Sequence, residues 1–450
     1  MSVINYLKII FIVFCATSSI ATSQILKNAN TDSPIGFATV EADGVPTTTG
    51  GAGGDTVVVT TGDQLNELML SRKDAHFDDN NPPIIILVQD TLHFTEKEML
   101  DVKETYDVSI FGIGKNAVIE GFGLNVYRSH NIIIRNIEFR DCPDDAINVT
   151  DSLSHHVWID HCTFSDSPDN DPDAKRHDGL LDIKHGACYV TVSWNHFYNH
   201  QKTCLLGNSD NTGDEDIGRL KVTYHHNWFD NTNSRHPRVR FGECHVFNNY
   251  YDGSISGMSY GIASTMEADV VVEANYFNGV DAPTHAGYAA SDPGDLVEKN
   301  NYYRNSGNPE TRGEAFDPRT CYEYTPDAAE TILELVKTGA GAGKLYSTGI
   351  NNPKTVNSRS FQLNQNFPNP FNPQTQIIYE LYQAEKVELA IFDLLGRKID
   401  IIFNGHQKAG KYEITWKAIE SSGNPLPSGT YWARLKTETG MQMIKMSLIR

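Results

Sequence analysis

Short apolar runs recur along the middle of the chain, and each closes on an aromatic residue. Ile132–Phe139 and Val157–Phe164 are the first two, and the pattern returns four more times as far as Phe277. The closing aromatics, extended by Tyr303, follow one another at intervals of 22 to 33 residues: Phe139, Phe164, Phe197, Phe229, Tyr251, Phe277 and Tyr303. A repeat of this length with one short β-rich group per copy is typical of a solenoid.

An asparagine stands two positions before each of the last five aromatics: Asn195, Asn227, Asn249, Asn275 and Asn301. In stacked coils, equivalent positions form ladders, with ring on ring and amide on amide, because an amide side chain both donates and accepts hydrogen bonds. We therefore predict an all-β chain whose main domain, residues 24–345, is a parallel β-helix. A β-sandwich would require the seven aromatics to align by chance.

Two short helices are predicted at the ends of this domain. Thr61 and Gln64 form a capping box that starts the first helix, after an irregular, Gly-rich lead-in. Its apolar face needs a surface to cover, and the open end of a solenoid provides one. The second helix is predicted over residues 326–337, with proline in its first turn and Gly339 just past its end.

The pattern changes after residue 345. Residues 346–360 are small and polar, which predicts a linker. Residues 361–450 hold short alternating runs, such as 387–392 and 412–416, separated by Gly, Asn and Pro. Six or seven short strands at this spacing predict a small C-terminal β-sandwich.

Charge divides the chain at nearly the same place. The chain carries 37 Lys+Arg against 57 Asp+Glu, a net charge of −20. Residues 359–450 hold 11 basic and 8 acidic residues, and the remainder holds 26 and 49. Because no basic field is present, we exclude nucleic acid as a partner. An acidic protein that acts on an acidic polymer needs local positive charge or a bound cation to offset repulsion.

The N-terminus has the pattern of a signal peptide. Lys8 precedes the apolar run 9–14, and small residues follow at 16–23, so we predict a signal peptide over residues 1–23 and a secreted or cell-surface location. The run is too short to span a bilayer, and no transmembrane segment is predicted. We expect a monomer. Six cysteines follow the signal, and their spacing fixes no disulfide pairing but is consistent with small apolar groups stacked in the interior.

The residues that carry chemistry gather between Asp178 and Arg240. Asp178 and Asp182 lie four residues apart, Lys202 follows, and Arg235 and Arg240 flank a proline. Carboxylate oxygens suit Ca²⁺, and lysine and arginine suit sugar carboxylates. The stretch therefore predicts a site that binds a hard cation and an anionic substrate together.

Three histidines are tempting as general bases. His161, His225 and His226 fall inside the predicted strand runs, however, which favours structural hydrogen bonding.

Four motifs are similar to the signatures of pectate lyases of polysaccharide lyase family 1, in order and in spacing, over roughly residues 35–345: Trp158-Ile159-Asp160-His161, Asp182-Ile183-Lys184, Tyr224-His225-His226-Asn227 and Arg235-His236-Pro237-Arg238-Val239-Arg240. The resemblance implies a right-handed parallel β-helix with short capping helices. It also implies Ca²⁺-dependent cleavage of α-1,4-polygalacturonate (pectate) by β-elimination, which gives 4,5-unsaturated oligogalacturonides.

The resemblance further implies a role for each matching residue. The primary calcium carboxylates match Asp145, Asp178 and Asp182; the substrate-binding cations match Lys202 and Arg240; the catalytic base matches Arg235. A free guanidinium loses its proton only above about pH 12, so an arginine base implies better activity under alkaline conditions.

One position departs from the family pattern. Pro143 stands where some members have a further calcium aspartate. The neighbouring Asp144 is expected to point the other way, because successive side chains of a strand alternate between its faces.

Two other functions are open to the same sequence. A pectin lyase that acts on methylated substrate needs no calcium, and the retained Asp145, Asp178 and Asp182 argue against it. A non-catalytic, polysaccharide-binding β-helix would require loss of the base or of the calcium carboxylates, and none of them is lost.

The C-terminal part resembles the sorting domain of the type IX secretion system. The resemblance is carried by its opening at 366–373, by 393–397 and by 428–431. It implies that residues 361–450 are an address read by that machinery during export across the outer membrane.

Overall fold

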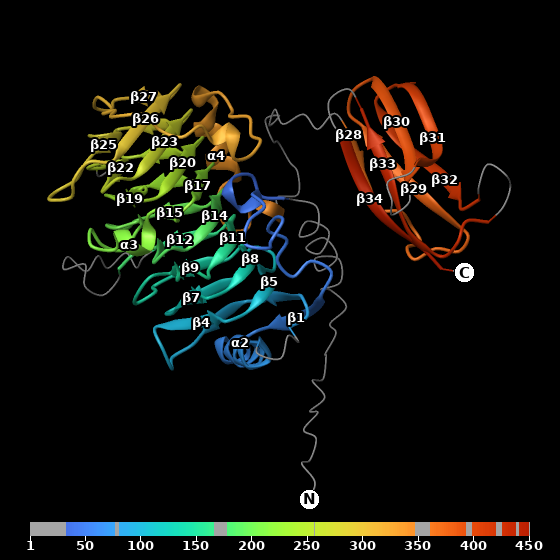
Figure 1. Cartoon of the computed structure of the whole chain (residues 1–450), viewed down its shortest axis with the longest axis horizontal. Coiled ribbons are helices and arrows are strands. Elements are labelled where there is room, and N and C mark those ends of the chain that lie inside the picture. Colours follow the sequence, from blue (N-terminus) through green and yellow to red (C-terminus); the bar gives the residue numbers. More distant parts are fainter. Residues whose placement is uncertain are drawn as a thin grey trace, which may run out of the picture. The chain divides into compact units, whose positions relative to one another are not determined.

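The computed structural model describes residues 33–76, 81–165, 178–255, 257–346, 361–392, 398–419, 425–437 and 441–449 (Figure 1). The chain divides into two compact units, residues 1–348 and 349–450. The predicted signal peptide, and the predicted linker beyond residue 346, lie outside the described residues.

The N-terminal unit is a parallel β-helix, as predicted (Figure 1). Each complete coil adds one strand to each of three parallel sheets. One sheet, here called the site sheet because it contains the predicted site residues or the segments just before its strands, has eight strands: β4 (Met99–Lys103), β7 (Gly123–Tyr127), β10 (Ile147–Thr150), β13 (Leu181–Lys184), β16 (Cys204–Leu206), β19 (Arg238–Arg240), β22 (Ile262–Thr265) and β25 (Thr284–Ala286).

The other two parallel sheets form the remaining walls of the β-helix. One has ten strands: β1 (Asp55–Val59), β2 (Ile84–Val88), β5 (Tyr106–Gly112), β8 (His130–Arg135), β11 (His155–Asp160), β14 (Cys188–Ser193), β17 (Val222–His225), β20 (Glu243–Phe247), β23 (Asp269–Glu273) and β26 (Asp295–Lys299). The other has nine: β3 (Thr91–His93), β6 (Val118–Glu120), β9 (Glu138–Arg140), β12 (Thr163–Ser165), β15 (His196–Tyr198), β18 (Trp228–Asp230), β21 (Tyr250–Asp252), β24 (Tyr276–Asn278) and β27 (Tyr302–Arg304).

Each apolar run of the sequence folds across the corner between the ten- and nine-stranded sheets. In the run Ile132–Phe139 the corner residue is Asn136, whose φ of 60° turns the chain from β8 into β9. The equivalent corner residues of the next six coils also have positive φ: His161, Trp194, His226, Asn248, Ala274 and Asn300. One repeated left-handed residue therefore divides each run into two strands.

Both predicted ladders form inside the β-helix. The seven aromatic rings stack with neighbouring centroids 4.5–5.3 Å apart and planes within 12° of parallel. In the amide ladder, each Nδ2 donates to the Oδ1 of the asparagine one coil on, at 2.9–3.0 Å, from Asn195 to Asn301. The same Oδ1 atoms accept backbone N–H groups, so the buried turns are satisfied.

The first predicted helix covers the end of the solenoid. It is α2 (Gly62–His76), and the Gln64 N–H donates to Thr61 Oγ1 at 3.2 Å, as in the predicted capping box. Gln64 Oε1 in turn accepts from the Thr60 N–H at 2.8 Å, one residue before the expected Thr61. Leu65 and Met69 are buried in the core of the β-helix. A short helix, α3 (Gly213–Asp216), lies in the connection after β16.

The second predicted helix begins later than the sequence indicates. It is α4 (Ile332–Gly339), preceded by the 3₁₀ turn η3 (Ala329–Thr331), and Gly339 is its last residue. Asp327 holds the chain extended before it: its N–H donates to Asn248 Oδ1, its carbonyl accepts from Asn248 Nδ2, and its carboxylate is 3.0 Å from His226 Nε2. These tertiary bonds outweigh the helix-starting preference of Pro326.

Residues 325–346, here called the strap, run back along the corner residues. Beyond Asp327, the Gly341 N–H donates to the Trp194 carbonyl and the Gly343 N–H donates to Asn136 Oδ1. The strap ends in η4 (Lys344–Tyr346); the remaining 3₁₀ turns are η1 (Phe37–Thr39) and η2 (Pro318–Thr320). The strap thus ties several coils together.

The C-terminal unit is a small antiparallel β-sandwich, as predicted. One sheet contains β28 (Phe361–Leu363), β29 (Gln374–Leu381) and β32 (Gly410–Lys417); the other contains β30 (Glu385–Phe392), β31 (Lys398–Gln407), β33 (Gly429–Lys436) and β34 (Met441–Leu448). The two sheets share one apolar core, which includes Ile377, Leu389 and Trp416.

The cysteines of the β-helix that the structure describes are free thiols. Among the described residues no disulfide forms, and five of the six cysteines are buried: Cys142, Cys162, Cys188, Cys204 and Cys244. Across the described residues, every helix is too short or too polar to cross a membrane.

Candidate active site

The structure brings all six predicted site residues to neighbouring strands of the site sheet. Each lies on a strand or just before one: Asp145 before β10, Asp178 before β13, Asp182 on β13, Lys202 before β16, Arg235 before β19 and Arg240 on β19. Because these strands are parallel and adjacent, residues that are up to 95 positions apart in the sequence meet on one face.

Two of the carboxylates are buried and share one ammonium group. Asp145 and Asp182 are each 2% exposed, and Lys184 Nζ lies 2.8 Å from Asp145 Oδ2 and 3.5 Å from Asp182 Oδ2. Burial and the neighbouring Asp145 raise the pKa of the Asp182 carboxyl to about 7. Burial opposes the charge of Lys184, but Asp182 and Asp145 together raise the pKa of its ammonium.

Lys184 received no role from the sequence, although a signal was present. In Asp182-Ile183-Lys184 the two charged residues are two apart, so both face outward while Ile183 enters the core. A positive charge between two buried carboxylates shows how strongly this position favours a cation.

Alternation along a strand predicts that Asp144 points away from the calcium carboxylates, and this prediction is wrong. It lies in a bend before β10, and one oxygen each of Asp144, Asp145 and Asp178 lie within 4.8 Å of one another. Burial and the charge of Asp145 raise the pKa of the Asp144 carboxyl. Side chains alternate only where the backbone is extended, and residues 143 and 144 lie in a bend instead.

Gly179 allows the carboxylates to approach. Its N–H donates to Asp145 Oδ1 at 2.9 Å. A Cβ at this position would lie 2.4 Å from Asp182 Oδ1 and 2.8 Å from Asp145 Oδ1. Any side chain here would force the two buried acids apart.

Lys202 faces the exposed carboxylate of the group. Its Nζ donates to Asp178 Oδ1 at 3.3 Å, and the side chains are 34% and 56% exposed. A backbone bridge joins Lys202 to Ser234, next to Arg235. Lys202 is therefore within reach of both the acids and the arginine.

Arg235 is held through its backbone. Its φ is 65°, and its carbonyl accepts from the Cys204 N–H at 2.7 Å. The next residue, His236, is buried, and its Nδ1 is 2.9 Å from the Tyr260 carbonyl oxygen. Because His236 is anchored, the backbone from which the half-buried Arg235 side chain projects is held in place.

Arg240 is fixed by the connection after β16. Its Nε donates to Asp210 Oδ1 at 2.6 Å, and its Nη1 donates to the Gly207 carbonyl at 3.2 Å. Gly207 has a φ of 87°, and a Cβ there would lie 2.7 Å from the Arg240 carbonyl oxygen. Asp210 was not singled out by the sequence, because nothing in its local pattern shows that its loop folds back onto β19.

The three histidines make structural contacts away from the site sheet, as predicted. His161 Nδ1 is 2.6 Å from Asp160 Oδ2. His225 and His226 face each other with their Nδ1 atoms 2.9 Å apart. All three belong to the ten-stranded sheet or its corner.

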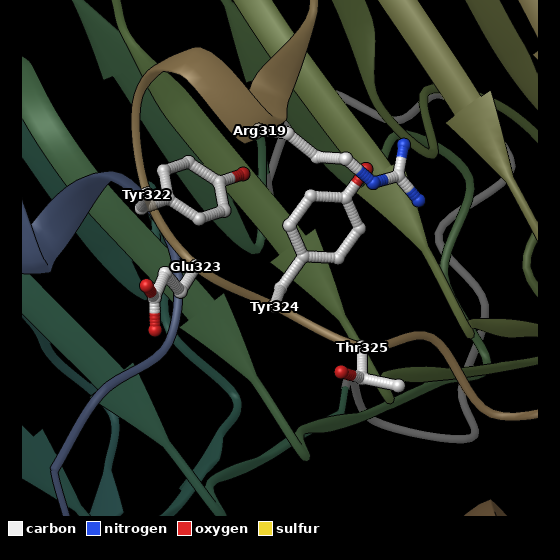
Figure 2. A pocket seen from close by; sticks show the side chains of 5 residues that line it. All are labelled: Arg319, Tyr322, Glu323, Tyr324 and Thr325. Atoms are coloured by element: carbon white, nitrogen blue, oxygen red, sulfur yellow. The ribbon is translucent and has the colours of Figure 1, made fainter.

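An open pocket of about 510 Å³ lies at the outside of the ten-stranded sheet, lined by residues 319 and 322–325 (Figure 2). Its polar groups are engaged with that sheet: the Tyr324 hydroxyl donates to Glu273 Oε2 at 2.6 Å, and the Tyr322 hydroxyl lies 2.7 Å from His245 Nδ1. The pocket contains none of the predicted site residues. We interpret these hydrogen bonds as the contacts that hold residues 319–325 against the ten-stranded sheet.

The acidic group of the site sheet suits a hard cation. It offers carboxylate oxygens alone, the ligand type that Ca²⁺ prefers. Burial and the neighbouring Asp145 raise the pKa of the Asp144 and Asp182 carboxyls despite Lys184, and a divalent ion would favour their charged forms. The residues present therefore fit the calcium that the family resemblance implies.

Known proteins resemble most of this chain. A pectate trisaccharide-lyase of Thermotoga maritima is 36% identical and covers 77% of this chain and 98% of its own length. Another, from Bacillus licheniformis, is 38% identical over 69% of this chain and 86% of its own length. The crystal structure of a pectate lyase from Bacillus sp. N165 in complex with trigalacturonate matches with a TM-score of 0.62 and 32% identity, covering 69% of this chain and 99% of that one.

Family models match both units. The model of the FlgD Ig-like domain matches residues 375–440, within the C-terminal β-sandwich. The model of the pectate lyase family matches residues 8–345. With a parallel β-helix, a family model that matches most of its length and relatives of this similarity, the chain belongs to the pectate lyase family and is a polysaccharide lyase.

Proposed function

We propose that this enzyme cleaves α-1,4-linked polygalacturonate by β-elimination with the six predicted residues in their implied roles. The observation that carries the proposal is the convergence of acids, Lys202 and the two arginines on four neighbouring strands. Within this family, such a face joins a cation site to fixed positive charge for an anionic sugar.

Arg235 is proposed as the base. In its neutral form it takes the proton from C5, which is acidic because it lies α to the C6 carboxylate, and becomes a guanidinium cation. The electrons of the C5–H bond form the C4–C5 double bond, and the C4 oxygen leaves with its bonding pair and gains a proton from water. Lys202 and Arg240 hold negative charge as it develops, and loss of one such donor typically costs about 10²–10³ in rate.

Ca²⁺ is proposed as the cofactor. Asp145, Asp178 and Asp182 would hold it, with Asp144 in place of the aspartate that Pro143 displaces. When bound, the ion supplies Lewis-acid charge beside the substrate carboxylate. Lys184 holds the buried acids in place and balances their charge.

The test is turnover of polygalacturonate followed by the ultraviolet absorbance of the unsaturated product, with and without a chelator. We expect absorbance that disappears with chelator and returns with added Ca²⁺. Equal rates with chelator would remove the calcium role, and reducing ends without absorbance would show hydrolysis. Unsaturated product from highly methylated pectin, and none from polygalacturonate, would show a pectin lyase instead. Chromatography of the products would show whether trisaccharides, named in both relatives, dominate.

We also propose that the chain is exported as a monomer and that its C-terminal unit is a type IX sorting domain. Support comes from the opening motif at 366–373 and from the Ig-like fold. Deletion of residues 361–450 in a host with this machinery should retain active enzyme in the periplasm. Normal export of the deleted form would contradict the sorting role.

A further inference from the structure

A third arginine stands on the site face without a role. Arg238 is on β19, where Val239 is buried in the core, so Arg238 and Arg240 both project outward. Arg238 pairs in register with Leu205, which pairs with Asp182. Neighbouring strands are about 4.8 Å apart, so Arg238 lies about 10 Å along the site face from the buried Asp182.

The structure orients the Arg238 side chain with neutral groups. Its Nη2 donates to Ser291 Oγ at 2.7 Å, and its guanidinium lies over the Tyr288 ring, 5.2 Å from the centroid. Tyr288 packs against the buried Tyr260 with ring centroids 4.5 Å apart. A stacked and hydrogen-bonded guanidinium is preorganised for recognition of an anion.

A counter-charge is missing around Arg238. Within the described part of the chain, no carboxylate lies within salt-bridge distance of it, and its buried Nε has no hydrogen-bond partner. Asp210, whose charge acts on Arg238 from a distance, pairs directly with Arg240 and accepts from Ser291. Burial and the positive charge of Arg240 lower the pKa of Arg238. An anion from outside would give this half-buried cation the direct charged partner that it lacks.

We infer that Arg238 is a substrate-binding residue that takes a free carboxylate of a sugar unit next to the one at Arg235, and so selects non-esterified stretches of the polymer. The inference rests on the proposed function. Polygalacturonate carries one carboxylate on every sugar, so a second carboxylate is available at each position. A methyl ester there would remove the charge and leave the guanidinium without a partner.

Arg238→Gln tests this assignment with two readouts. Calorimetric binding of trigalacturonate should weaken about tenfold, the value of one lost charged hydrogen bond. In turnover, KM for polygalacturonate should rise by a similar factor with kcat nearly unchanged, because this charge is paired in both ground and transition states. On highly methylated pectin the variant and the wild type should differ little. Arg238→Lys should recover part of the affinity.

Arg319→Gln is the matched control. Arg319 also lies over a tyrosine, 4.9 Å from the Tyr324 centroid, but on the pocket of Figure 2. It should change neither binding nor KM. Unchanged trigalacturonate binding in Arg238→Gln, or an equal loss on both polymers, would overturn the role of Arg238. Absence of unsaturated product from the wild type would overturn the proposed function instead, while the binding comparison still decides the role of Arg238.

Discussion

At the scale of single residues, Gly179 allows the two buried acids of the site to lie close together. Gly179→Ala would push apart Asp145 and Asp182, because a Cβ there lies within 2.8 Å of both. We expect the Ca²⁺ concentration for half-maximal activity to rise about 10–100-fold, as for other changes that displace metal ligands. Titration of turnover after chelation measures this. Gly405→Ala, where a Cβ would be 3.4 Å from Phe403, is the control. Equal Ca²⁺ requirements in the two variants would contradict the prediction.

Substitutions of Arg235 and Lys202 should have different effects on kcat and KM. Arg235→Lys keeps the charge but moves the nitrogen and removes the planar fork. If Arg235 is the base, kcat and kcat/KM should fall together by several powers of ten with little change in affinity. Lys202→Ala should mainly raise KM, because its partner carboxylate is already charged in the ground state. A modest rate loss with a large rise in KM would make Arg235 a substrate clamp.

At the scale of elements, the aromatic ladder holds the coils in register. Phe197 is fully buried between Phe164 and Phe229, with ring centroids 4.8 and 5.1 Å away. Phe197→Ala leaves a cavity between two coils and should lower the free energy of unfolding by about 3–5 kcal/mol. Urea unfolding of residues 1–350 measures it. Tyr302→Ala, at a partly exposed ring of β27, should cost far less; similar losses would mean that the ladder is not the source of stability.

Paired histidines should make the β-helix sensitive to acid. His155 and His156 face each other with their Nδ1 atoms 2.8 Å apart, an arrangement that requires one donor and one acceptor. Burial, with His130 and His156, lowers the pKa of His155 to about 4. The unfolded imidazole titrates near 6.5. The unfolded state therefore binds more protons between these values, and stability present above pH 6.5 is lost as pH falls toward 4.

Thermal unfolding from pH 7 to pH 4 measures this effect. The midpoint should fall steadily below pH 6.5. His93→Gln, which alters an imidazole whose side chain is 63% exposed, should follow the wild-type curve. A midpoint that stays constant between pH 7 and pH 5 would contradict the buried, neutral state of the pair.

At the scale of the whole molecule, activity should reside in the N-terminal unit. A chain ending at residue 350 keeps the site sheet and the strap, and should retain full kcat and KM. A chain ending at residue 324 loses the strap bonds to His226, Trp194 and Asn136 and should unfold at lower temperature. Loss of activity in a folded 1–350 chain would show that the C-terminal unit contributes to catalysis.

The sequence predicted those features that depend on repetition. Aromatics and asparagines at matching positions stack whatever the detailed path of each coil, so the β-helix and both ladders follow from spacing alone. The start of the first helix follows from a local capping box. The start of α4 was predicted too early, because Asn248 and His226 hold Asp327 from other coils.

By itself, the sequence determined the fold class, the two β-rich units and the six residues whose motif resembles a family site. Only the tertiary structure decided the place of Asp144, Lys184, Asp210, Ser291 and Arg238. Asp144 lies in a bend before β10, and Asp210 and Ser291 lie in two loops that meet although they are 81 residues apart. Lys184 and Arg238 lie on β13 and β19, and their roles depend on partners from other coils. Such contacts leave no local periodicity, because backbone direction in a loop is set by its partners rather than by its own pattern.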